Sequence, residues 1–62
     1  MKIELSAERS TREPGYLITA YYDDLYAGEA LFIGYPKREA LRQARETVKN
    51  YGGLGNYDSR RG

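Results

Sequence analysis

The chain has 62 residues, including seven tyrosines but no cysteine or histidine, and its formal net charge is +1. This composition excludes disulfides, thiolate zinc sites and imidazole ligands, and the length allows one small domain that buries about 60% of its unfolded surface. Residues 1–31 carry three basic and six acidic side chains, whereas residues 32–62 carry seven basic and three acidic ones, so the two halves have opposite charge.

The chain begins with an alternation of polar and apolar residues. Over residues 2–7, Ile3, Leu5 and Ala7 fall on one side of an extended segment and polar side chains on the other. Residues 8–15 are polar and end in Pro14-Gly15, a pair typical of turns. We therefore predict a strand with one solvated side, followed by a loop.

Two further strands are predicted over residues 16–22 and 25–35, which are rich in aromatic and β-branched side chains. Asp23-Asp24 separates them and indicates a tight hairpin, because aspartate hydrogen-bonds nearby backbone amides. Gly28 indicates a bulge or a close cross-strand contact, and a bulge would exchange the two sides of the third strand. The pattern favours Phe32 facing the helix, with Ile18 and Ala20 as its cross-strand neighbours.

A helix is predicted from Lys37 to Tyr51. Pro36 suits the first turn of a helix, where backbone amides have no partner. The apolar residues recur at helical spacing and form one stripe, made of Ala40, Leu41, Ala44, Val48 and Tyr51. Gly52-Gly53 is a typical helix stop, after which Leu54 can pack back on the last turn.

This order of elements predicts an α+β fold, in which a three-stranded, mostly antiparallel sheet carries one C-terminal helix on one face (βββα). Residues 1–55 form the single domain. Residues 56–62 have little apolar content and are predicted to be a flexible tail. One helix covers only one face of the sheet, so the other face meets water or a partner.

The strand-to-helix junction, Phe32-Ile33-Gly34-Tyr35-Pro36-Lys37-Arg38-Glu39-Ala40, resembles small uncharacterised bacterial, cyanobacterial or phage-borne proteins. In these proteins an aromatic hairpin runs into Gly-Tyr and then Arg/Lys-Glu-Ala, although Ser or Thr usually stands where this chain has Pro36. The arrangement is also similar to the partial double-stranded-RNA-binding-like domains of antitoxins, without their aspartate-proline signature. Both resemblances imply the βββα order and no particular function.

No motif indicates catalysis, a cofactor or a metal. Asp23-Asp24 is better explained as a turn, and Glu29 as a solvent-facing strand residue than as a carboxylate of raised pKa. The Gly-Tyr-Pro and Gly-Gly-Leu-Gly segments lack the spacing of phosphate-binding loops. We therefore expect a non-enzymatic protein without a cofactor or small-molecule substrate. No apolar run reaches the roughly 20 residues of a membrane span, and Met1-Lys2-Ile3-Glu4-Leu5 lacks the apolar core typical of a signal peptide, so we expect a cytoplasmic location.

Tyrosine-bearing strands suggest a protein-binding surface. Tyr21 and Tyr22 lie on opposite sides of the sheet, so at least one points away from the helix. Tyrosine is enriched at interfaces because it combines a large apolar area with a polar tip. The predicted binding residues are Leu17, Thr19, Tyr21 and Tyr26, and the partner is another protein or a second copy of the chain.

The alternative is nucleic-acid binding through a cationic flank of the helix. Four basic side chains at spacings of four, three and four residues align along this flank, and two arginines of the tail can join them. The candidate nucleic-acid-binding residues are Arg38, Arg42, Arg45, Lys49, Arg60 and Arg61. Glu39 and Glu46 precede Arg42 and Lys49 by three residues, a spacing typical of ordinary helix ion pairs. A merely solvated helix face therefore explains the same pattern.

Overall fold

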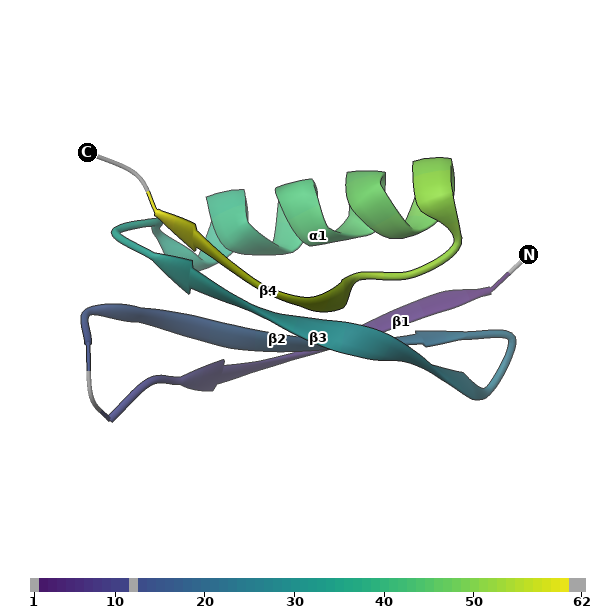
Figure 1. Ribbon diagram of the computed structural model, residues 1–62, viewed down its shortest axis with the longest axis horizontal. Helices are drawn as coiled ribbons and strands as arrows, with labels where there is room; N and C mark the ends of the chain where they lie inside the picture. The colour runs from purple at the N-terminus through teal and green to yellow at the C-terminus, as the bar shows by residue number, and fades with distance from the viewer. Residues whose placement is uncertain (1, 12, 61–62) are drawn as a thin grey trace.

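Three antiparallel strands lead into one helix, which confirms the predicted βββα order. A computed structural model describes residues 2–11 and 13–60, with residues 56–60 described as backbone only. The strands are β1 (Ile3–Arg9), β2 (Gly15–Tyr22) and β3 (Leu25–Ile33), and the helix is α1 (Lys37–Tyr51). Helix α1 lies along one face of the sheet, and the other face points away from it (Figure 1). In the described part of the chain, no helix is long and apolar enough to cross a membrane.

The core lies between α1 and the face of the sheet that bears Phe32, as the alternation predicts. Its buried residues are Ile18, Ala20, Ala30, Phe32, Ala40, Ala44, Val48 and Leu54. Half of these are alanines, on both the helix and the strands. Small side chains at these positions let the helix backbone approach the sheet closely, so that the few large residues fill the remaining space. Ile3, Leu5 and Ala7 of β1 pack against this core from the side.

The register between β2 and β3 shifts between Thr19 and Tyr21, which confirms the bulge suggested by Gly28. Gly28 has a φ of 95°, in the region that favours glycine. On one side of the shift Ile18 pairs with Ala30, and on the other Tyr21 pairs with Tyr26. The hairpin turn between these strands is formed by Asp23 and Asp24, both at positive φ (50° and 67°).

The two ends of α1 follow their local sequence. Pro36 is the N-cap residue and contributes no side-chain hydrogen bond. At the other end Gly52 adopts the left-handed conformation and donates its N–H to the carbonyl of Val48, which closes the helix. Tyr51 shares the periodicity of the apolar stripe but is 83% exposed, because it follows the last buried turn at Val48.

The predicted tail is replaced by a fourth strand over most of its length. Residues Gly55–Arg60 form β4, which pairs in parallel with β3, so the sheet order is β1-β2-β3-β4. Leu54 is buried and donates its N–H to the carbonyl of Ala27 at 2.7 Å, which brings the chain to the edge of β3. The polar composition concealed this strand, because strand pairing uses backbone groups that every sequence supplies. Residues 61 and 62 of the predicted tail lie outside the described residues.

Candidate functional site

The four predicted protein-binding residues lie together on the face of the sheet opposite α1. The register places Leu17, Thr19 and Tyr21 of β2 beside Leu31, Glu29 and Tyr26 of β3. On the other side of β2, the register aligns them with Glu8, Ser6 and Glu4 of β1. We call this surface the open face and define it by Glu4, Ser6, Glu8, Leu17, Thr19, Tyr21, Tyr26, Glu29 and Leu31.

Large apolar groups are exposed at one end of the open face and at the adjoining hairpin. Tyr21 is 39% exposed, Tyr26 57% and Leu25, at the hairpin, 73%. The rings of Tyr21 and Tyr26 meet edge to face, with centroids 6.1 Å apart and planes at 73°. This geometry is favourable for aromatic pairs and keeps both rings in a defined orientation.

Tyr26 is also held by a neighbour on its own strand. Its hydroxyl donates a hydrogen bond at 2.9 Å to Oε1 of Glu29, three residues further along β3. This bond stabilises the protonated phenol, so it raises the pKa of Tyr26 above its usual value, with a smaller contribution from burial. The open face therefore presents an ordered tyrosine whose polar tip is already engaged.

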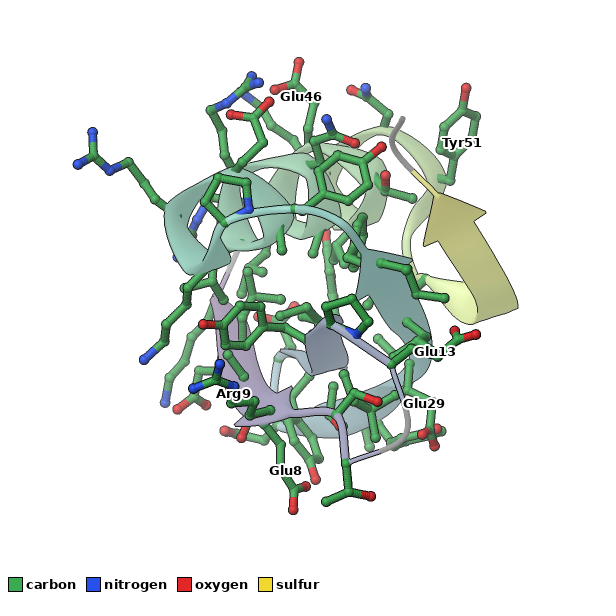
Figure 2. All side chains as sticks on the ribbon, turned by 90° about the vertical axis from the view of Figure 1, so that its left-hand side faces the viewer. Glu8, Arg9, Glu13, Glu29, Glu46 and Tyr51 are labelled. Carbon is green, nitrogen blue, oxygen red and sulfur yellow. The ribbon has the colours of Figure 1, made fainter. Side chains whose placement is uncertain are left out.

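Carboxylates surround the apolar part of the open face. Figure 2 shows Glu8 and Glu29 on the side of the sheet away from the helix, and Glu46 on the outer side of the helix. Lys2 is a cation paired with this acidic surround: its Nζ lies 3.6 Å from Oε1 of Glu4 and 3.5 Å from Oδ1 of Asp24. The open face thus combines leucine and tyrosine side chains with an acidic surround.

The cationic flank of α1 borders β1. A groove of about 570 Å³ lies between helix and strand and is lined by Ile3, Glu4, Leu5, Arg38, Leu41, Arg42 and Arg45. We call it the arginine groove. Sequence reasoning found the three arginines but missed the β1 side of this groove, because no local pattern shows which strand a helix will cover.

One of the expected ion pairs on the helix is present. Arg42 Nη2 lies 2.6 Å from Oε1 of Glu39, and this contact raises the pKa of Arg42 above its usual value. Among the described residues, Arg38, Arg45, Glu46 and Lys49 form no ion pair. The second predicted pair, Glu46 with Lys49, is therefore not formed, and two arginines of the groove are free to meet a ligand.

Arg60 and Arg61 are the two tail arginines that were expected to join the cationic flank. Arg60 lies in β4, at the opposite edge of the sheet from β1, and its side chain is not described. Arg61 lies outside the described residues. The backbone thus places β2 and β3 between Arg60 and the groove.

The residues considered for catalysis have structural roles. Asp23 forms the hairpin turn and accepts a hydrogen bond from the backbone N–H of Lys2 at 2.9 Å. Glu29 is half-buried and accepts the bond from Tyr26. Among the side chains that the structure describes, no group of three or more acidic residues is placed to hold a metal ion.

Comparison with known proteins leaves these two surfaces to be interpreted from their own geometry. No protein-family model, no curated protein and no solved structure matches the chain.

Proposed function

We propose that the chain is a non-enzymatic binding module that contacts another protein through the open face. The observation that carries this proposal is the position of Tyr21 and Tyr26, which form an ordered, exposed aromatic pair on a sheet face that the helix leaves uncovered. Rigid tyrosines lose little conformational entropy when they become buried, which suits them to the centre of an interface. Leu17 and Leu31 extend the same surface along the strands.

Charge indicates what kind of protein the open face accepts. If two copies packed face to face, Glu4, Glu8 and Glu29 of one would approach the same carboxylates of the other, and like charges in an interface oppose association. A different protein, with apolar side chains framed by lysine or arginine, complements both the tyrosines and their acidic surround. The proposal therefore favours a basic partner protein over self-association and includes a cytoplasmic location, which fractionation of a tagged chain tests.

Affinity purification from the native host tests this function. The tagged chain should recover a specific protein after nuclease treatment, and Tyr21→Lys combined with Tyr26→Lys should abolish its recovery. Tyr51→Lys is the matched control, because Tyr51 is more exposed than either but lies outside the open face. Equal recovery by the double variant and the wild type would refute the proposal.

A second candidate function is nucleic-acid binding by the cationic flank, and the observation that favours it is the alignment of Arg38, Arg42 and Arg45 along one groove. Binding through phosphates should weaken steeply with salt. Combining Arg42→Glu with Arg45→Glu should then abolish binding to DNA and RNA fragments in a gel-shift assay. Binding that ignores salt, or survives the double variant, would exclude this function.

A further inference from the structure

The outer edge of β1 is a free strand edge. In the ladder with β2, Asp23 donates its N–H to the carbonyl of Lys2 at 2.8 Å, and Ser10 donates to Gly15 at 3.0 Å. Hydrogen-bonded pairs alternate in an antiparallel ladder, so even-numbered residues of β1 bond to β2. The backbone N–H and C=O groups of the odd-numbered residues point outward instead, and these residues are Ile3, Leu5, Ala7 and Arg9. No strand among the described residues pairs with them.

A free edge of seven residues is a template for an added strand. An added strand would project alternate side chains to the two sides of the sheet. On the helix side, those side chains would enter the arginine groove, where Ile3, Leu5 and Leu41 supply an apolar floor. Glu4 also lines this groove, and its carboxylate is paired with Lys2 Nζ at 3.6 Å. Here Arg38 and Arg45 form no ion pair with any described residue, and guanidinium groups bind carboxylates in a geometry that gives two parallel hydrogen bonds.

On the opposite side, the added strand would lie next to Glu4, Ser6 and Glu8 of the open face. Acidic side chains are unfavourable there, whereas small polar or basic ones are compatible. The two faces of the sheet thus favour different residues of one added strand. Acidic side chains fit the helix face, where they meet the arginine groove, and neutral or basic side chains fit the open face. We propose that β1 and the arginine groove form a β-addition site for an extended acidic segment of a partner protein.

A second copy of this chain fits the site poorly. If β1 paired with β1 of a second copy, the side chains of Ile3, Leu5 and Ala7 of that copy would face the groove. These three side chains are apolar and offer no charge to the arginines. This pairing would also bring two arginine-lined helices toward each other across the joint, and this repulsion disfavours the dimer. Charge complementarity therefore indicates an acidic segment as the occupant.

Binding of a labelled peptide tests the proposal. The probe is a fluorescein-labelled peptide of alternating glutamate and threonine, and the control peptide has the same composition with its glutamates in one block. Fluorescence anisotropy at low salt should show that the alternating peptide binds about ten-fold more tightly than the control, because only alternation places every carboxylate above the groove. Equal binding, or no binding of either peptide, would overturn the proposal.

Two variants separate the groove from the edge. Arg38→Glu combined with Arg45→Glu should raise the Kd about ten-fold or more, whereas Lys37→Glu combined with Lys49→Glu, the same change outside the groove, should have a much smaller effect. Ala7→Pro removes one outward N–H without removing a bond to β2, since proline is tolerated where the N–H faces solvent. Ala7→Pro should therefore raise the Kd of the alternating peptide by a similar factor.

Hydrogen exchange tests the proposal on the wild-type chain, so the result does not depend on whether a variant folds. Adding the alternating peptide should slow exchange at the amides of Ile3, Leu5 and Ala7, which point to the edge where no described strand pairs with β1. Slower exchange only at α1 would indicate binding to arginines without strand addition and would overturn the proposal. If the groove preferred nucleic acid to the peptide, and Ala7→Pro left that preference intact, the proposal would be overturned in favour of phosphate binding. If the chain formed a dimer that Ala7→Pro abolished, the proposal would be overturned in favour of a second copy as the occupant. Peptide binding that persists when Tyr21 and Tyr26 are changed to lysine distinguishes this site from the open face.

Discussion

Tyr21 and Tyr26 occupy paired positions on β2 and β3, and their rings meet edge to face at 6.1 Å. They share the open face only because of the register shift at Gly28. Strict alternation from Phe32 would place Tyr26 on the core side of β3, whereas the extra residue turns it outward and turns Ala27 toward the core. The bulge therefore creates the aromatic pair on which the proposed interface depends.

The bulge predicts an unusual sensitivity at Gly28. A Cβ there would lie 2.6 Å from the backbone nitrogen of Gly55, and the residue also has positive φ. Gly52 has a similar φ but open space around it, so Gly52→Ala should cost only about 1–2 kcal/mol for the left-handed conformation. Gly28→Ala should cost at least about 1 kcal/mol more, because β4 must shift. Urea denaturation of both variants measures the difference, and equal losses would contradict the account of β4.

The hairpin turn predicts a tolerated, even favourable, substitution at Asp24. Both turn residues have positive φ, a conformation that glycine adopts more readily than aspartate. The ion pair between Lys2 and Asp24 is exposed and contributes about 0–1 kcal/mol, so its loss offsets only part of the conformational gain. Asp24→Gly should therefore leave the thermal midpoint unchanged or raise it slightly. A fall equivalent to more than about 1 kcal/mol would show that the ion pair dominates.

The core predicts a large loss at Phe32 and almost none at Leu25. Phe32 is 1% exposed and its ring packs against that of Tyr35 at 5.5 Å. Phe32→Ala should cost about 3–5 kcal/mol, comparable to the whole stability expected for a domain of this size. Leu25→Ala, at an exposed hairpin position, should stay within about 0.5 kcal/mol. Circular dichroism during denaturation compares them, and similar losses would mean that the core is misplaced.

The hydrogen bond from Tyr26 to Glu29 predicts a pH dependence. The pKa of Tyr26 is raised on folding, so its contribution to stability is complete below the unfolded pKa of about 10 and is lost as pH rises through the folded pKa. Ultraviolet titration should show that Tyr26 ionises at a higher pH than a model phenol. Glu29→Gln should lower that pKa, because it replaces the charged acceptor of the hydrogen bond with a weaker, neutral one and removes the carboxylate charge. An unchanged titration in Glu29→Gln would show that the bond is absent in solution.

Local chemistry was sufficient to predict the helix and the hairpin. Helix α1 begins after Pro36 and ends at Gly52, as the sequence pattern indicates, and its buried residues are Ala40, Ala44 and Val48. Each of these signals depends only on residues within one or two helical turns. The composition of the open face also followed from alternation, once a bulge at Gly28 was allowed.

Long-range pairing was harder to predict. Strand β4 pairs with β3 through backbone hydrogen bonds, and its polar residues show no apolar–polar alternation that would predict a strand. The β1 side of the arginine groove depends on which strands α1 covers, which the helix stripe alone does not specify. Tyr51 kept the helical period without being buried, because periodicity does not show where the sheet beneath a helix ends.

Site-specific photocrosslinking in the native host tests the proposed interface most directly. A benzoylphenylalanine placed at Tyr21 should give one discrete adduct with a partner protein after irradiation, because this side chain lies at the centre of the exposed aromatic pair. The same group placed at Tyr51, which is more exposed but points away from the sheet, should give none (Figure 2). No adduct at Tyr21, or the same adduct from both positions, would contradict the proposal that the open face binds a protein.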